Sequence, residues 1–404
     1  MRVAVVNVKF SPNLGDGLLA ECLEAELRAS TPGLETVAID LAGRTAYGEG
    51  GMRNRRAALS ILAMMPGPVR RMLVGILLGR TARRTLRPAW RKVMESTDAV
   101  VVGGGNLMAD NDLNFPIKIR AALAEAKDAG LPVGVFGVGV ADNWSQPGQA
   151  MFREALSQSR LVHAAVRDQR SQRIWRDRLS VSGVRDAVVC RDPAVLTALH
   201  FPAAPRQAGP AHVALGVTDP LALRYHSDLP LASGATLTDW IVALVERMVS
   251  DGLRVSVFTN GSPEDRTYLD GLAPRLRAVS PDAVEIAPAF ATPTELAAFI
   301  SRHDLVMAHR LHACICAFAY AIPTIGFTWD RKLNSFFESV GRQDYVLEAG
   351  VKSIDDTMDL VNRTLAEGVE PTAHAAIVAE SRAQVAALAA ALQNDGVARP
   401  SAVA

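Results

Sequence analysis

Three residues that could bind or protonate an anionic molecule follow one apolar segment in the last third of the chain. His309, Arg310 and His312 come directly after Asp304–Ala308, whose composition predicts a strand. Histidine donates or accepts a proton near neutral pH, and arginine binds carboxylate or phosphate through two parallel hydrogen bonds. Lys332 follows the next predicted strand, so a parallel sheet would bring it to the same edge. The group predicts a site for a small anion, with a histidine as acid or base.

Three other predicted strands also end in turns that suit an anionic ligand. Glycine lets the backbone approach a ligand closely, and the N–H groups at the start of a following helix attract anions. An arginine at the end of a strand can reach such a ligand with its guanidinium group. A capped turn, glycines required by packing and a surface ion pair would explain the same residues without a ligand. The turns are Asn13-Leu14-Gly15-Asp16 after Val3–Val8, Gly103-Gly104-Gly105-Asn106 after Ala99–Val102, and Arg167-Asp168 after Leu161–Val166.

A metal site is the other chemistry to weigh at the histidines. If the chain is helical from Leu311, then His309, His312 and Cys316 share one helix stripe and could bind zinc. A cysteine in such an apolar stretch is more often a buried core residue, and the spacing matches no established zinc pattern. We therefore expect no metal. The four cysteines of the chain are too few for a disulfide scaffold, which favours a reducing cytoplasm.

The elements that must position these residues alternate between strands and helices along the chain. Apolar runs such as Val133–Val140 and Val213–Val217 are separated by helical stretches such as Ile117–Ala129. This pattern predicts parallel sheets with helices on both faces, which is an α/β fold. Phe201–Pro210 contains three prolines and interrupts the alternation as a linker would. We therefore predict two doubly wound, Rossmann-like domains that face a cleft.

The predicted domain boundaries follow from that linker. Residues 1–204 form the N-terminal domain, 205–350 a second domain that carries Arg310 and His312, and 351–404 a C-terminal helical region. A chain of 404 residues exceeds what one hydrophobic core usually supports, which agrees with two domains. Because no apolar run reaches roughly 20 residues and the first residues lack a secretion-signal pattern, we expect a protein that is neither secreted nor integral to a membrane.

The charge of the chain is balanced overall but not locally. Lys and Arg number 43 against 42 Asp and Glu, which gives no sign of nucleic-acid binding. Residues 51–95, in contrast, hold eleven basic side chains and one acid among apolar residues such as Met72 and Ile76. A basic amphipathic segment is typical of a peripheral element that binds an anionic membrane surface. An ordinary surface helix that caps the first domain has the same pattern, so both interpretations stay open.

Taken in order, the motifs resemble the polysaccharide pyruvyl transferase family over most of the chain. Besides the three turns above, the resemblance rests on Asp192-Pro193-Ala194 and on Arg310-Leu311-His312 followed by Pro323 and Lys332. Family members have two Rossmann-like domains, as B-type glycosyltransferases do. They transfer pyruvate from phosphoenolpyruvate to two hydroxyls of a sugar as a ketal. The sugar often belongs to a polysaccharide, a cell-wall polymer or a lipid-linked intermediate.

The resemblance also implies roles for particular residues. His312 matches the catalytic acid, and Arg167 and Lys332 match cations that bind the donor. The other motif residues are assigned to substrate binding: Arg310, Asn13, Asp16, Gly104, Gly105 and Asn106. Phosphoenolpyruvate acts as donor substrate, so no cofactor is required. The expected partners are a sugar acceptor, lipid-linked in some family members, and an anionic membrane surface at residues 51–95. The expected location is the cytoplasm, with peripheral attachment to the inner membrane face.

The sequence departs from the family pattern in two places, and two other functions stay open. Ala308-His309 precedes the Arg-Leu-His motif, and Thr328-Trp329-Asp330-Arg331 leads to Lys332, where the family usually has other residues. A nucleotide-sugar-dependent glycosyltransferase of the same fold is the first alternative, since fold does not determine function. A non-catalytic scaffold or sugar-binding subunit is the second.

Overall fold

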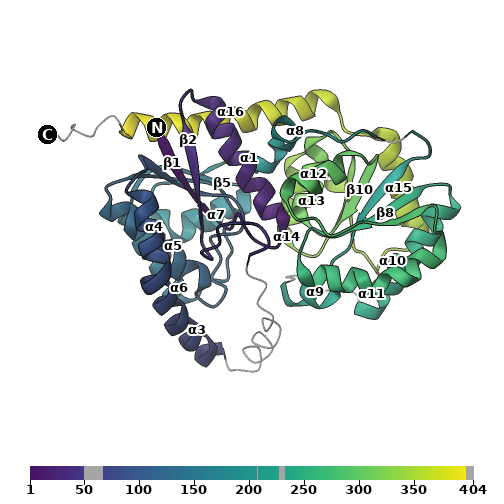
Figure 1. Ribbon diagram of the computed structural model, residues 1–404, viewed down its shortest axis with the longest axis horizontal. Helices are drawn as coiled ribbons and strands as arrows, with labels where there is room; N and C mark the ends of the chain where they lie inside the picture. Colours follow the sequence, from purple (N-terminus) through teal and green to yellow (C-terminus); the bar gives the residue numbers. More distant parts are fainter. Residues whose placement is uncertain (50–66, 207, 227–232, 397–404) are drawn as a thin grey trace. The chain divides into compact units, whose positions relative to one another are not determined.

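The computed structural model describes residues 1–49, 67–206, 208–226 and 233–396, which divide into two compact units. Unit 1 comprises Met1–Phe10, Leu19–Pro193 and the chain from Glu380 on, and unit 2 comprises Ser11–Leu18 and Ala194–Ala379. Each unit holds one parallel six-stranded sheet flanked by helices (Figure 1). The predicted α/β fold is therefore confirmed for both halves of the chain.

The sheet of unit 1 has the strand order β2-β1-β3-β4-β5-β6. Its central strands are buried on both faces, which is why their sequences read as continuous apolar runs. The edge strand β2 begins at the exposed Glu35 and was not predicted, because a half-exposed strand lacks such a run. The strands are β1 (Arg2–Asn7), β2 (Glu35–Asp40), β3 (Ala99–Gly103), β4 (Pro132–Val138), β5 (Arg160–Val166) and β6 (Val188–Val189).

Helices cover both faces of this sheet. Trp90 and Phe152 belong to the core on one face, while Leu23 approaches Gly103 and Leu388 approaches Gly134 from helices that cover the other. The helices are α1 (Leu14–Ser30), α3 (Gly67–Thr81), α4 (Arg87–Met94), α5 (Asn114–Asp128), α6 (Gln146–Ser157), α7 (Gln169–Arg178) and α16 (Pro371–Gly396), with a π-helical turn η1 (Ala82–Leu86) between α3 and α4 and a 3₁₀ turn η2 (Ser180–Ser182) after α7.

The sheet of unit 2 has the strand order β12-β11-β10-β7-β8-β9. Strand β10 lies in its centre and pairs with β7 through Leu305 and with β11 through Val306. The residues that follow β10 therefore lie at the edge of the sheet between the carboxyl ends of β7 and β11. The strands are β7 (His212–Gly216), β8 (Arg254–Phe258), β9 (Val284–Ile286), β10 (Leu305–Ala308), β11 (Thr324–Phe327) and β12 (Val346–Leu347).

The helices of unit 2 complete its core. Trp240 and Met358 pack with the sheet residues Val257 and Phe327 in one hydrophobic cluster. The helices are α8 (Thr197–His200), α9 (Pro220–His226), α10 (Gly234–Ser250), α11 (Pro263–Val279), α12 (Pro293–Ser301), α13 (Leu311–Ala319), α14 (Arg331–Ser339) and α15 (Ile354–Glu367), with 3₁₀ turns η3 (Pro193–Leu196) and η4 (Gln343–Tyr345).

The boundaries of the two units differ from those predicted at residues 204 and 350. The main division lies between Pro193 and Ala194, and α15 belongs to unit 2 rather than to a separate C-terminal region. The segment Ser11–Leu18, which follows the first strand of unit 1, clusters with unit 2. Sequence composition could not predict that this segment belongs to unit 2, because the assignment depends on which residues the segment contacts.

Helix α16 is the only described helix that is long and apolar enough to cross a membrane, by length and composition alone. Its buried residues recur about every fourth position from Ile377 to Leu392, as in a helix with one face packed on a protein core. In unit 1, Arg382 donates to Glu26 and Gln384 accepts from the Arg191 backbone N–H. These contacts fit a helix that packs on the core of unit 1.

Candidate functional site

The carboxyl end of β10 carries the first predicted group. His309 follows the strand directly and is buried against the ring of Phe327, at 4.9 Å between ring centroids. Its carbonyl oxygen accepts a hydrogen bond from the Trp329 indole N–H at 2.6 Å. Burial, with a smaller contribution from Arg310, lowers the pKa of His309 to about 3. Burial therefore disfavours the charged form of His309, and its packing on Phe327 fits a structural residue.

His312 lies in the first turn of α13 and contacts a segment from the other end of the chain. A Cβ atom placed on Gly15 would lie 2.5 Å from His312 Cβ and 2.8 Å from its Nδ1, so only glycine allows this approach. Asp16 Oδ1 lies 4.0 Å from His312 Nδ1. The segment is held in place within unit 2, because Leu14 donates its backbone N–H to the Asn260 carbonyl oxygen at 2.8 Å.

Asp16 is the electrostatic partner of His312. Burial raises the pKa of Asp16, while His312, a hydrogen bond from Ser11 and the charges of Arg310 and Lys332 act in the opposite direction. The carboxylate therefore faces three cationic or ionisable groups in unit 2. Asn13, in the same turn, accepts the Asp16 backbone N–H through its carbonyl oxygen at 3.0 Å.

Arg310 is already engaged in an ion pair within the protein. Its Nε and Nη2 donate to Oδ2 of Asp265 at 2.9 and 2.5 Å, and Asp265 is fully buried. The other carboxylate oxygen of Asp265 accepts the Asp219 backbone N–H at 3.0 Å. Burial raises the pKa of Asp265, and Arg310 lowers it in part. Arg310 therefore fixes the start of α13, and the prediction that it binds substrate stays untested.

Lys332 lies in the first turn of α14, at the edge of the sheet that the sequence predicted. Its Nζ lies 2.9 Å from Asp330 Oδ2 and 5.7 Å from the centre of the Trp329 ring. Asp330 also caps α14, because its Oδ1 accepts the Leu333 backbone N–H at 3.0 Å. The lysine is about one-third exposed, so its charge stays available to a ligand that can compete with Asp330.

In unit 1, the glycine turn after β3 has the backbone geometry that the sequence suggested. Gly104 and Gly105 have φ angles of 76° and 69°, in the region that other residues avoid. A Cβ on Gly104 would overlap the side chain of Leu19. The Gly105 carbonyl oxygen accepts the Gly139 backbone N–H at 2.8 Å. The turn is therefore locked to the loop after β4, and packing accounts for Gly104 without any ligand.

Arg167 and Asn106 meet beside Gly139 in unit 1. A Cβ on Gly139 would lie 2.5 Å from Arg167 Nη2 and 2.8 Å from Asn106 Oδ1. The Arg167 side chain is 7% exposed, and its Nε lies 3.4 Å from Asp168 Oδ2 without forming a hydrogen bond. Asp168 caps α7 through the Ser171 backbone N–H. The alternative of an Arg167–Asp168 surface pair is thus only half correct, because the pair exists but Arg167 is buried.

The metal hypothesis finds no support in the part of the chain that the structure describes. Among those residues, no group of three or more His, Cys, Asp or Glu side chains could hold a metal ion. Cys316 is fully buried inside α13, as a core residue would be. His309, His312 and Cys316 therefore do not form a ligand set.

Some residues of these clusters escaped the sequence analysis. Asp265 and Asp330 hold the two cations of unit 2, and Gly139 provides the space that Arg167 occupies. Asp330 could have been found, because it precedes a helix in the pattern of an N-cap. Asp265 and Gly139 carry no local signal, since their roles arise from contacts with residues distant in the sequence.

Comparison with known proteins gives one family and a common fold. A family model described as polysaccharide pyruvyl transferase matches residues 13–331. No curated protein matches the chain in sequence.

Solved structures resemble the chain in fold at low identity. The UDP-GlcNAc 2-epimerase from Methanocaldococcus jannaschii shows 11% identity and a TM-score of 0.55, over 92% of this chain and 94% of that one. The UDP-GlcNAc 2-epimerase from Neisseria meningitidis, bound to UDP-GlcNAc, shows 12% identity and a TM-score of 0.53, over 98% of this chain and all of that one. The spinosyn rhamnosyltransferase SpnG shows 17% identity and a TM-score of 0.49 over 98% of this chain. The two epimerases share the predicted α/β fold class, with its two parallel sheets flanked by helices.

Proposed function

The chain belongs to the polysaccharide pyruvyl transferase family, and from that premise we propose that it transfers pyruvate from phosphoenolpyruvate to two hydroxyls of a sugar as a ketal. The observation that carries the proposal is the pair of Asp16 and His312 at the carboxyl end of β10, with Lys332 in the same unit. It combines a candidate proton donor, a neighbouring carboxylate and a cation for an anionic substrate.

The reaction starts with a proton transfer to carbon. His312 protonates the methylene carbon of phosphoenolpyruvate, and C2 becomes an oxocarbenium-like centre. One sugar hydroxyl adds to C2 and loses its proton, after which the bond between C2 and the phosphate oxygen breaks. A second hydroxyl adds to C2 and loses its proton to close the ketal. Of the two protons released, one restores His312 and the other leaves with the phosphate, so the step is balanced.

The fixed charges of unit 2 suit this chemistry. The carboxylate of Asp16 lies 4.0 Å from His312 Nδ1, and Lys332 offers a positive charge to a carboxylate or phosphate. Since burial lowers the pKa of His309, His312 is the better candidate for the acid of the two neighbouring histidines. The proposal therefore assigns the acid to one residue.

In unit 1, Arg167 is the best candidate for a donor-binding cation. Its guanidinium is buried next to Asn106, and the carboxylate of Asp168 lies beside it. A buried guanidinium can bind a carboxylate or phosphate with two parallel hydrogen bonds, which a lysine cannot do. We assign Arg167 and Asn106 to phosphoenolpyruvate on these grounds. Gly104 and Gly105 shape the turn that carries Asn106.

The acceptor is a sugar of a polysaccharide or of its lipid-linked precursor, and we expect the protein to act in the cytoplasm. The reaction itself calls for no metal or redox cofactor, because proton transfer and fixed charges supply every step. The alternative of a nucleotide-sugar glycosyltransferase rests on fold alone, and fold does not determine function. The family match favours pyruvyl transfer over that alternative.

The test is to incubate the full chain with labelled phosphoenolpyruvate and a panel of simple and lipid-linked glycosides. Release of phosphate together with a pyruvyl mass gain on one glycoside supports the proposal. A parallel arm replaces phosphoenolpyruvate with nucleotide sugars. Sugar transfer in that arm, with no product from phosphoenolpyruvate on any acceptor, would establish the alternative.

A further inference from the structure

The basic segment of unit 1 divides into two parts with different surroundings. From Ala82 on, the residues Ala82, Leu86, Trp90 and Met94 recur every fourth position and are buried in the core of unit 1. This part does cap the domain, as one of the two interpretations predicted. Helix α3 does not follow that pattern, and residues 51–66, with Arg53, Arg55 and Arg56, lie outside the described residues.

Helix α3 is attached along one side only. Arg70 forms an ion pair with Asp112 at 2.9 Å, and Leu78 packs against the core of unit 1. The other side exposes large apolar residues, which is unusual for a soluble surface helix. Figure 1 shows α3 leading away from the sheet of unit 1. The exposed fractions are 48% for Val69, 62% for Met72, 49% for Ile76 and 54% for Leu77.

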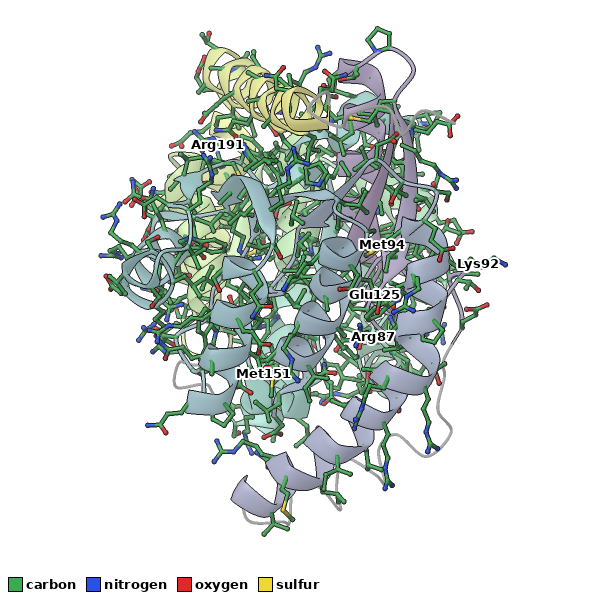
Figure 2. All side chains as sticks on the ribbon, turned by 90° about the vertical axis from the view of Figure 1, so that its left-hand side faces the viewer. Arg87, Lys92, Met94, Glu125, Met151 and Arg191 are labelled. Carbon is green, nitrogen blue, oxygen red and sulfur yellow. The ribbon has the colours of Figure 1, made fainter. Side chains whose placement is uncertain are left out.

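A groove of about 860 Å³ runs beside this apolar stripe, between α3, α5 and α6. Met72 and Ile76 line it from α3, Ile117 from α5 and Met151 from α6. Figure 2 shows Met151 on this side of unit 1. Arginines, among them Arg71, Arg80 and Arg83, stand along the same groove. It thus combines apolar walls with a positive rim.

The arginines of this region fall into two groups. Arg87 and Arg91 both bind Glu125, whose side chain is 1% exposed. Figure 2 shows Arg87 beside Glu125. Burial tends to raise the pKa of Glu125, but hydrogen bonds from Arg91 and Arg87 keep it below its usual range. These two arginines neutralise an internal charge.

The second group has no acidic partner among the described residues. It consists of Arg71, Arg80, Arg83 and Arg84, all exposed, of which Arg83 donates only to the Gly79 carbonyl oxygen. Lys92 is exposed in the same way on α4. These charges are therefore available to an external anion, next to exposed apolar side chains.

We propose that α3 and the groove beside it form a docking surface for an anionic phospholipid bilayer. The charge pattern matches negatively charged headgroups, and the apolar stripe from Val69 to Leu77 matches the boundary between headgroups and acyl chains. A protein partner would have to place carboxylates and a complementary apolar surface at matching positions, whereas a bilayer presents anionic phosphates above an apolar layer along its whole extent. This proposal is independent of the proposed reaction.

The test measures binding of the full chain to vesicles of phosphatidylcholine with phosphatidylglycerol, and of phosphatidylcholine alone, by cosedimentation at low and high salt. We expect binding to the anionic vesicles that weakens as salt rises. The triple variant R71S/R80S/R84S should lower the partition coefficient about 10²-fold, since each arginine near the surface contributes about fivefold. R71K/R80K/R84K, which keeps the charges, should bind nearly as the parent protein does.

A matched control removes three exposed arginines from another part of unit 1. R173S/R176S/R185S changes the net charge equally, but these residues lie on or after α7, away from the groove lining. It should keep vesicle binding. M72S/I76S/L77S tests the apolar stripe without changing the charge and should also lower binding to the vesicles. Thermal melting of this variant should show that the fold is intact.

Three results would overturn the proposal. The first is no binding to anionic vesicles at low salt. The second is equal loss of binding in R71S/R80S/R84S and R173S/R176S/R185S, which would reduce the effect to net charge. The third is concentration-dependent self-association that M72S/I76S/L77S abolishes, which would assign the stripe to a second copy of the chain. Since the assay contains no phosphoenolpyruvate, its failure would leave the proposed reaction unaffected.

Discussion

Asp16 Oδ1 lies 4.0 Å from His312 Nδ1, although the two residues come from opposite ends of the sequence. Gly15 makes the approach possible, because any larger residue there would meet the imidazole ring. The pair unites the first loop of the chain with the Arg-Leu-His motif in a single unit. If the proposed reaction is correct, this pair is where the proton for phosphoenolpyruvate is held.

The first prediction concerns the choice between the two histidines. His312→Asn should lower phosphate release from phosphoenolpyruvate by about 10²–10⁴-fold, which is the usual effect of removing a general acid. Binding of phosphoenolpyruvate should persist. His309→Asn should instead lower thermal stability, because His309 packs on Phe327 in the core. Steady-state kinetics and melting curves separate the effects, and near-normal turnover of His312→Asn would remove it from the mechanism.

The second prediction concerns Asp16, where activity and stability should change in opposite directions. Because burial raises the pKa of Asp16, the folded protein binds its proton more tightly than the unfolded chain does. Stability from this group is therefore present at low pH and is lost as the pH rises through the folded pKa. Asp16→Asn should raise the melting temperature near neutral pH and lower activity.

The pH dependence of the same variant checks the role of the charge. Asp16→Asn removes the carboxylate that lies 4.0 Å from His312 Nδ1, so the pH profile of activity should differ from that of the parent protein. The measurement is the pH profile of kcat/KM for both proteins. Superimposable profiles would show that Asp16 does not act on the acid, and a lower melting temperature would contradict the stability argument.

The third prediction concerns Gly15. Gly15→Ala places a Cβ within 2.5 Å of His312 Cβ, so the histidine or the loop must move. Activity should fall by at least tenfold, because small displacements of a catalytic group are costly. Gly271→Ala is the matched control, since a Cβ there has no neighbour within 4 Å and the helix should gain up to about 1 kcal/mol. Equal activity of the two variants would refute the steric argument.

The fourth prediction concerns the ion pair of Arg310 and Asp265. Arg310→Gln leaves a fully buried carboxylate without its cation, which should cost about 3 kcal/mol of unfolding free energy. Adding Asp265→Asn to Arg310→Gln should restore most of that stability. Denaturant unfolding of the two single variants and the double variant measures the coupling. Additive single effects would show that the pair does not stabilise the protein, and would leave Arg310 free to bind substrate.

The fifth prediction concerns Arg167. Arg167→Lys should raise the KM for phosphoenolpyruvate by about tenfold or more, because the two parallel hydrogen bonds of a guanidinium are lost. Asp168→Asn, which keeps a side chain able to cap α7, should leave that KM unchanged or lower it. If both variants damaged stability equally and spared the KM, Arg167 would serve only its ion pair with Asp168.

Local pattern was sufficient for much of the fold. Strands such as β3 and β4 are buried on both faces, so their apolar runs could be read without knowledge of any contact. Half-exposed or very short elements escaped, as β2 and β12 did, because they present too few apolar residues to form a pattern. The domain boundary also moved, since membership of Ser11–Leu18 in unit 2 depends on contacts with Asn260 and His312.

The sequence by itself determined which residue types stand at the ends of the strands: His312 after β10, Lys332 after β11 and Arg167 after β5. Tertiary structure alone decided their surroundings, because burial and ion-pair partners depend on residues that are distant along the chain. It separated the buried, neutral His309 from His312 beside Asp16, and engaged Arg310 with Asp265. Tertiary structure also divided the basic segment, whose later part is buried in the core of unit 1 while α3 exposes an apolar stripe. Sequence periodicity predicts an apolar face but does not show whether that face packs against the protein.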